Sequence, residues 1–281
     1  MIADPLVTTA WLADNLDAPD LKVVDASWYF PQEQRDAQAE YAAAHIPGAV
    51  FFDIDDIADD TTDLPHMLPD AVKFSARVRR LGLGDGSRIV VYDQLGLRSA
   101  ARVWWTFRVM GHQDVFVLDG GLPKWIAEGR RVEDIPPPPR ERHFTARFDG
   151  GLVRGVDQVR KAIETGEAQI VDARPAARFS GEAPEPRAGL RGGHIPGAFS
   201  MPSSALLAPD GTVLGKDRLE ALFTSAGVDL DRPIITSCGS GITAAMLALA
   251  LARLGRWRAP VYDGSWAEWG GRDDTPVVTG A

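Results

Sequence analysis

The chain has 281 residues, which is enough for two domains of ordinary size. Hydrophobic residues make up 45% and charged residues 25%, as in globular proteins, and the net charge of −9 argues against nucleic acid or an anionic membrane as partner. The N-terminal residues lack the basic and apolar stretches of a signal peptide, and Cys238 is the only cysteine, so an intrachain disulfide is excluded. We therefore expect a cytoplasmic protein that does not span a membrane.

Short runs rich in Val and Ile alternate with helical patterns along the chain. The runs lie at 21–24, 88–92, 115–118, 169–171, 233–236 and 260–262. They are typical of strands buried on both faces of a sheet. Helical patterns cover 98–110 and 243–254, and Gly255 is a suitable C-terminal cap for the second. The alternation predicts parallel β-sheets flanked by helices, the α/β class.

The second half of the sequence repeats the first. The block His45–Ala49 returns unchanged at His194–Ala198, and several other blocks recur in the same order at offsets of 144 to 149 residues. A repeat of this length indicates two globular copies and not a solenoid. Four prolines at 136–139 favour an extended linker between them. We expect an N-terminal domain at 1–135, a Pro-rich linker at 136–150 and a C-terminal domain at 151–281.

Cys238 stands in a context that favours reactivity. It follows the predicted strand at 233–236 and opens a short loop, Gly239-Ser240-Gly241-Ile242, before the helix that begins at Thr243. The two glycines allow a tight turn with positive φ, whose N–H groups point inward and stabilise an anion. We expect this loop to favour the thiolate, which is the nucleophilic form of cysteine.

The repeat supplies an internal control for this cysteine. The position that matches Cys238 in the first half is Asp93. A carboxylate cannot take up sulfur as a nucleophile, so we expect the first domain to be non-catalytic and the second to carry the chemistry.

These features together resemble the two-domain rhodanese superfamily. The resemblance rests on the tandem repeat, both His-Ile-Pro-Gly-Ala blocks and the Asp-Gly-Ser-Trp block at 263–266. Within the superfamily, the run Cys238-Gly239-Ser240-Gly241-Ile242-Thr243 looks like the active-site loop of 3-mercaptopyruvate sulfurtransferases, whereas thiosulfate-using relatives typically carry Arg and Lys after the cysteine. The resemblance covers nearly the whole chain and implies two rhodanese-like domains.

The resemblance also implies roles for individual residues. Cys238 would be the nucleophile, and Ser240, His66 and Asp55 would form a proton relay beside it. Arg178 and Arg187 would bind the carboxylate and carbonyl of the substrate, with the loop residues Gly239, Gly241, Ile242 and Thr243. Glu182 lies close to these arginines in the sequence, and we expect it to offset part of their charge.

The expected reaction passes sulfur from 3-mercaptopyruvate to Cys238 as a persulfide, releases pyruvate, and then gives the sulfur to a thiol such as thioredoxin or a low-molecular-weight thiol, or to cyanide. It requires neither a metal nor an organic cofactor, so none is expected.

Three other functions remain open at this point. Thiosulfate:cyanide sulfurtransferase activity would favour cations in the loop, which Gly239 and Ser240 do not supply. A cysteine phosphatase needs Arg six positions after the cysteine, where this chain has Ala244. A non-catalytic module that binds or carries persulfide for a partner would share the same loop.

Overall fold

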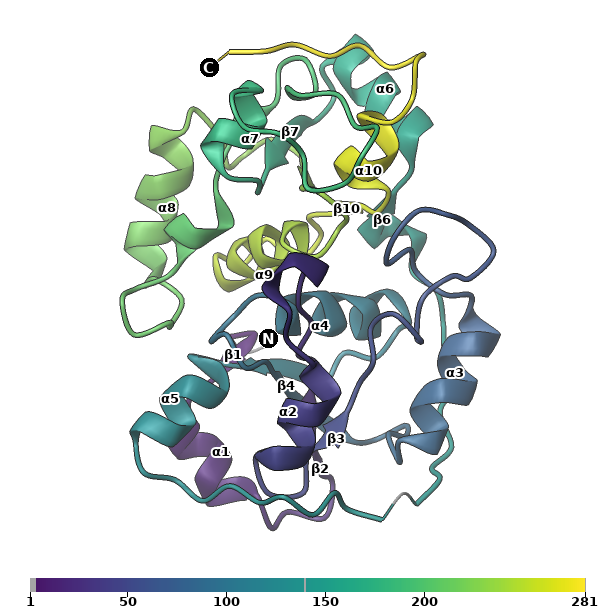
Figure 1. Ribbon diagram of the computed structural model, residues 1–281. Helices are drawn as coiled ribbons and strands as arrows, with labels where there is room; N and C mark the ends of the chain where they lie inside the picture. Colours follow the sequence, from purple (N-terminus) through teal and green to yellow (C-terminus); the bar gives the residue numbers. More distant parts are fainter. Residues whose placement is uncertain (1–3, 139, 281) are drawn as a thin grey trace. The chain divides into compact units, whose positions relative to one another are not determined.

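The chain folds into two compact units, shown in Figure 1. This computed structural model describes residues 4–138 and 140–280. Two sets of residues lie outside the described part of the chain. They are residues 1–3, in the N-terminal stretch that bears on the signal-peptide prediction, and Pro139, the last of the four linker prolines. The N-terminal unit comprises the chain up to Asp59, Leu68–Asp149 and Ala208–Val213; the C-terminal unit comprises Asp60–Met67, Gly150–Leu207 and the chain from Leu214.

The N-terminal unit is built on a five-stranded parallel sheet with the strand order β1-β5-β4-β2-β3. Its strands are β1 (Leu6–Val7), β2 (Leu21–Asp25), β3 (Val50–Phe51), β4 (Arg88–Tyr92) and β5 (Val115–Leu118). Its helices are α1 (Thr9–Asn15), α2 (Ala37–Ala43), α3 (Ala71–Arg80), α4 (Ala100–Val109) and α5 (Gly121–Ala127).

The C-terminal unit repeats this arrangement. Its strands are β6 (Val153–Arg154), β7 (Gln169–Asp172), β8 (Phe199–Ser200), β9 (Ile234–Ser237) and β10 (Val261–Tyr262). Its helices are α6 (Val156–Thr165), α7 (Ala176–Ser180), α8 (Lys216–Ser225), α9 (Ala244–Arg253) and α10 (Ser265–Trp269). The order β6-β10-β9-β7-β8 is that of the first sheet with each strand replaced by its repeat. The prediction of two α/β copies with parallel sheets is therefore confirmed.

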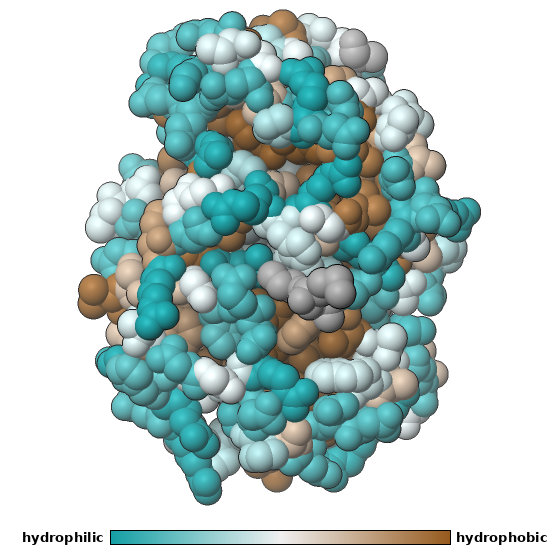
Figure 2. All heavy atoms as spheres, turned by 180° about the vertical axis from the view of Figure 1, so that it is seen from behind, coloured by the Kyte–Doolittle hydropathy of each residue, from teal (hydrophilic) through white to brown (hydrophobic). Residues whose placement is uncertain are grey.

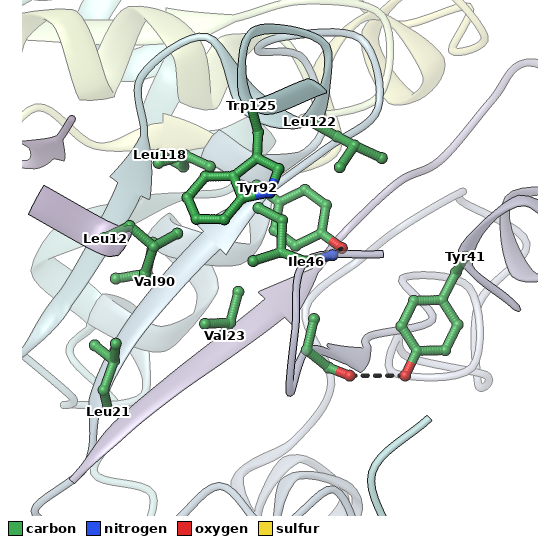
Figure 3. Packing of buried hydrophobic residues seen from close by; sticks show 11 residues of the cluster. Leu12, Leu21, Val23, Tyr41, Ile46, Val90, Tyr92, Leu118, Leu122 and Trp125 are labelled. Atoms are coloured by element: carbon green, nitrogen blue, oxygen red, sulfur yellow. Dashed lines mark hydrogen bonds between the residues drawn. The ribbon is translucent and has the colours of Figure 1, made fainter. Parts of the chain in front are cut away.

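Alternating side chains of the central strands bury both faces of each sheet. Figure 3 shows one face of the N-terminal sheet, where Val23 of β2 and Val90 of β4 pack against Leu12 of α1 and Trp125 of α5. Tyr41 of α2 joins this cluster and donates a hydrogen bond to the carbonyl of Ala49 at 2.7 Å. Because successive strand residues point to opposite faces, the neighbouring Val24 and Val91, which are fully buried, serve the other face.

The residues after the prolines pack along the N-terminal unit. Phe144, 1% exposed, joins an aromatic cluster with Phe74 of α3 and Phe107 of α4. The N–H groups of Arg147 and Asp149 donate to the end of α4 at 2.8 and 2.7 Å. The segment 140–149 is thus held by the buried Phe144 and by backbone pairing, features that the preceding prolines do not indicate.

The order of the strands determines where a ligand would bind in the C-terminal sheet. The chain leaves β7 toward β8 on one side and continues from β9 to β10 on the other, so β7 and β9 flank the point where the strand order reverses. In parallel sheets, ligands bind beyond the carboxyl ends of the strands at this point.

Figure 2 shows mostly polar side chains over one face of the molecule. No helix of the described chain is long and apolar enough to cross a membrane.

Candidate active site

Cys238 lies at the carboxyl end of β9, directly beside the reversal of strand order. The residue is 2% exposed. Its N–H donates to Oγ of Ser265 at 3.2 Å, and its carbonyl accepts from the N–H of Trp266 at 2.9 Å. The backbone on both sides of the side chain is therefore held by the start of α10, and the thiol belongs to a rigid loop.

The two glycines of the loop have different functions, which corrects the expectation that both adopt positive φ. Gly241 has φ of +77°, where a residue with a side chain would be strained. Gly239 does not share this conformation. A Cβ atom at Gly239 would lie 3.1 Å from Nη2 of Arg178, so the missing side chain lets the guanidinium approach the loop.

The matching loop of the N-terminal unit shows what such a turn binds. The carboxylate of Asp93, 1% exposed, accepts hydrogen bonds from the N–H groups of Leu95 at 2.9 Å, Arg98 at 2.6 Å and Ala100 at 2.9 Å. An anion thus occupies the centre of this turn, supplied by the chain itself. The amides at the corresponding positions of the second loop belong to Ser240, Thr243 and Ala245. This internal comparison supports the prediction that the second loop stabilises a thiolate on Cys238.

The remaining loop residues close around the cysteine. Ser240 is 4% exposed and Ile242 is 3% exposed. The hydroxyl of Ser240 makes no hydrogen bond within the described part of the chain, which leaves it available to a bound substrate. Thr243 is half-buried and precedes the first residue of α9.

Arg178 reaches the loop from α7, which follows the neighbouring strand β7. Its guanidinium binds the carboxylate of Glu185 through Nη2 and, at 3.3 Å, through Nε. Nη1 has no hydrogen-bond partner among the described residues, and the side chain is 16% exposed. The arginine is therefore oriented by Glu185 and retains one free edge beside Gly239.

The expectation that Glu182 offsets the charge of the arginines is wrong. Glu182 is exposed, whereas the side chain of Glu185 is 1% exposed and binds both Arg178 and Arg174. Arg174 in turn forms a buried ion pair with Asp172 at 2.7 Å. Burial alone would lower the pKa of Arg174, but Asp172 and Glu185 raise it above its usual range. This buried chain of alternating charges fixes Glu185, and through it Arg178.

The sequence did not single out Glu185, Arg174 or Ser265 as functional. Glu185 lies in the Pro-Glu-Pro-Arg block at 184–187, in which the sequence predicts a role for Arg187 alone. Ser265 replaces the glycine found at the matching Gly121 of the first half, and this difference within the repeat is a signal that sequence comparison can detect.

His66 and Arg187 meet within the C-terminal unit. Nη2 of Arg187 lies 3.3 Å from Nε2 of His66, although 121 residues separate them in the sequence. His66 is 8% exposed and has a φ of +61°, which is unusual for a residue other than glycine. Its segment, Asp60–Met67, belongs to the C-terminal unit, unlike the chain on either side of it.

Asp55 belongs to the N-terminal unit. Its carboxylate accepts a hydrogen bond from Nε1 of Trp28 at 3.0 Å. Its place in a relay with Ser240 and His66 therefore stays a prediction. Within the described part of the chain, no group of three or more His, Cys, Asp or Glu side chains is arranged to hold a metal ion.

Comparison with known proteins identifies this architecture. The family model described as "Rhodanese-like domain" matches residues 8–128 and 155–272. The 3-mercaptopyruvate sulfurtransferase of Escherichia coli K12 is 46% identical over 268 residues, covering 95% of each chain. The mitochondrial thiosulfate/3-mercaptopyruvate sulfurtransferase 1 of Arabidopsis thaliana is 44% identical over 98% of this chain and 78% of its own length.

A solved structure agrees with these relatives. The crystal structure of SseA from Escherichia coli superimposes with a TM-score of 0.87 at 43% identity, covering 94% of this chain and 99% of that chain. The two matched segments coincide with the two repeats of the sequence and with the two parallel sheets. The chain belongs to the rhodanese family and consists of two rhodanese-like domains.

Proposed function

We propose that the protein is a 3-mercaptopyruvate sulfurtransferase that carries sulfur as a persulfide on Cys238. The observation that carries this proposal is the meeting of two features at one loop. The lone thiol of the chain lies in a turn that matches the one around the Asp93 carboxylate, and Arg178 presents a free guanidinium edge next to Gly239 of the same turn. An α-keto acid with a terminal thiol suits a site that joins a nucleophile to cations for a carboxylate.

The first half-reaction transfers sulfur to the enzyme. The Cys238 thiolate attacks the substrate sulfur, the new S–S bond forms, and the electron pair of the C–S bond leaves as the enolate of pyruvate. The neighbouring ketone delocalises this charge, which makes carbon a tolerable leaving group. The proton of the substrate thiol then passes to the enolate carbon, so that pyruvate and a persulfide anion result.

The arginines stabilise the charge that develops during this step. Arg178, oriented by Glu185, and Arg187, beside His66, bind the carboxylate and the enolate oxygen. Ser240, whose hydroxyl has no partner in the described chain, and His66 move the proton. Asp55 completes the relay in this proposal.

The second half-reaction regenerates the thiolate. In this proposal, the persulfide anion accepts hydrogen bonds from the amides of Ser240, Thr243 and Ala245. The Asp93 carboxylate accepts such bonds from the matching amides of the first loop. An acceptor thiolate, from thioredoxin or a low-molecular-weight thiol, attacks the outer sulfur and leaves with it, and cyanide does the same. We place this reaction in a reducing compartment such as the cytoplasm, because the catalytic thiol must return to its reduced state.

Thiosulfate is the alternative donor, and two relatives from Arabidopsis thaliana are named for both donors. Thiosulfate is a compact dianion that carries its charge close to the transferred sulfur. The loop presents Gly239 and Ser240 there and no cation of its own, so we propose that thiosulfate is the poorer donor.

Intact-mass spectrometry after exposure to 3-mercaptopyruvate tests the proposal. Wild-type protein should gain the mass of one sulfur atom, while Cys238→Ser should gain none and release no pyruvate. Asp93→Asn provides the matched control, because it alters the equivalent loop of the other domain and should retain sulfur transfer. Residual turnover above a few per cent in Cys238→Ser would refute the persulfide mechanism.

A further inference from the structure

Ser265 has an unfavourable backbone conformation in the interior of the C-terminal unit. Its φ is +48°, and only Gln34 and His66 share a positive φ among the non-glycine residues that the structure describes. The residue is fully buried. Residues other than glycine persist in this region only where their surroundings require it, and such positions cluster at functional sites.

The hydroxyl of Ser265 connects two strands at the end where Cys238 lies. Its Oγ accepts the N–H of Cys238 at 3.2 Å and donates to the carbonyl of Tyr262 at 2.7 Å. Cys238 follows β9 and Tyr262 ends β10. A single side chain therefore fixes the peptide bond that precedes the nucleophile against the neighbouring strand.

The N-terminal unit provides a comparison without this hydroxyl. The matching residue is Gly121, with φ of +55°. The backbone bond from Leu122 N–H to the Asp93 carbonyl, 3.1 Å, corresponds to the bond from Trp266 N–H to the Cys238 carbonyl, 2.9 Å. A Cβ atom at Gly121 would lie 2.5 Å from that carbonyl, so the first loop accepts only glycine. The strained serine stands only in the half that carries the cysteine.

We propose that Ser265 is a positioning residue for Cys238. By holding the Cys238 N–H, it sets the orientation of the peptide bond and directs the sulfur toward the amides of Ser240 and Thr243. A glycine there would relieve the backbone strain and lose the hydrogen bond. The sulfur chemistry attributed to Cys238 rests on the proposed function, but the effect of Ser265 on thiol reactivity does not.

Two substitutions separate positioning from stability. Ser265→Ala and Ser265→Gly both remove the hydroxyl, but only alanine keeps the strain of a side chain at positive φ. We expect both variants to lose roughly 3- to 10-fold in the rate of Cys238 alkylation by iodoacetamide at pH 7, the effect of one hydrogen bond. The midpoint of the pH profile of alkylation should rise, and kcat with 3-mercaptopyruvate should fall by a similar factor with little change in KM. The melting temperature of the glycine variant should exceed that of the alanine variant.

Ser237→Ala is the matched control. Ser237 precedes Cys238, is 1% exposed, and its hydroxyl makes no hydrogen bond within the described chain, so alkylation should keep its wild-type pH profile in this variant. A Ser265→Gly variant with wild-type alkylation rate and kcat would overturn the proposal. It would also be overturned if the losses of alkylation rate and kcat in the two variants were proportional to their losses of melting temperature. If the Ser265 variants are alkylated more slowly than wild type as expected, but wild type does not turn over 3-mercaptopyruvate, the proposed function fails and the positioning role stands.

Discussion

Cys238 and Asp93 occupy the same position in two copies of one loop, and their side chains give the loops different properties. Asp93 fills the turn with its own carboxylate, which satisfies three backbone N–H groups. A thiol has a single sulfur in place of the two carboxylate oxygens. We expect it to leave the corresponding amides of the second loop available to a thiolate or persulfide. We therefore expect the first loop to be an unreactive turn and the second to be reactive.

Arg187 should set the preference for a keto-acid donor. Charge-assisted hydrogen bonds to a carboxylate contribute about 1.5–3 kcal/mol. Arg187→Ala should therefore lower kcat/KM for 3-mercaptopyruvate by roughly 10- to 150-fold in steady-state pyruvate release. Arg218→Ala, at an exposed position of α8, is the control for loss of a positive charge and should leave kcat/KM unchanged. Unchanged kinetics in Arg187→Ala would remove this arginine from the substrate site.

Asp25 should make the stability of the protein depend on pH. It matches Asp172 in the repeat, but Ser27 stands where Arg174 would pair with it. Burial raises the pKa of Asp25 to about 6, with a smaller contribution from the nearby charge of Asp93 and against hydrogen bonds from Ser27. The folded protein thus binds this proton more tightly than the unfolded chain. The resulting stabilisation is complete below about pH 4 and is lost as the pH rises through about 6.

Asp25→Asn removes this titration and keeps an acceptor for Ser27. Relative to wild type, the variant's advantage in unfolding free energy should grow by on the order of 1–1.5 kcal/mol from pH 5 to pH 8, because about half of the shift of the Asp25 pKa takes effect above pH 5, at about 1.36 kcal/mol per pKa unit. Urea unfolding at the two pH values measures this difference. An equal offset between variant and wild type at pH 5 and pH 8 would show that Asp25 does not titrate in this range.

At the scale of elements, periodicity and repetition predicted the centre of each domain and missed its edges. The buried strands β2, β4, β5, β7, β9 and β10 follow from continuous apolar runs, and α4 and α9 follow from the helical patterns after two of them. The edge strands β1, β3, β6 and β8 have two residues each, and no run rich in Val and Ile marks them as one marks the equally short β10. Their pairing depends on tertiary contacts that the local sequence does not encode.

The sequence likewise predicted the centre of the site and missed the contacts around it. The strand-loop-helix pattern located Cys238, while the resemblance supplied Arg178, Arg187 and His66. The pairing of Arg178 with Glu185 and not Glu182 depends on how the loop at 181–193 folds over β7, and this follows from long-range packing. The different functions of Gly239 and Gly241 likewise appear only when Arg178 is placed beside the loop.

At the scale of the whole molecule, the division into units does not follow the chain. The segment Asp60–Met67, which carries His66, belongs to the C-terminal unit although it lies within the first repeat. A fragment of residues 150–281 therefore lacks part of its own unit, including the partner of Arg187. Such a fragment should turn over 3-mercaptopyruvate far more slowly than the full chain. Full-length His66→Ala, assayed in parallel, shows how much of that loss comes from the histidine alone, and a fragment as active as the full chain would contradict this account.

Steady-state turnover with two donors tests the central claim most directly. Pyruvate release from 3-mercaptopyruvate and thiocyanate formation from thiosulfate would be measured on the same wild-type preparation with cyanide as the common acceptor. The account predicts a clearly higher kcat/KM for 3-mercaptopyruvate, because Arg178 of α7 offers a guanidinium edge for a carboxylate beside the loop, while the loop itself has no cation at the transferred sulfur. A higher kcat/KM for thiosulfate, or no turnover of either donor, would contradict it.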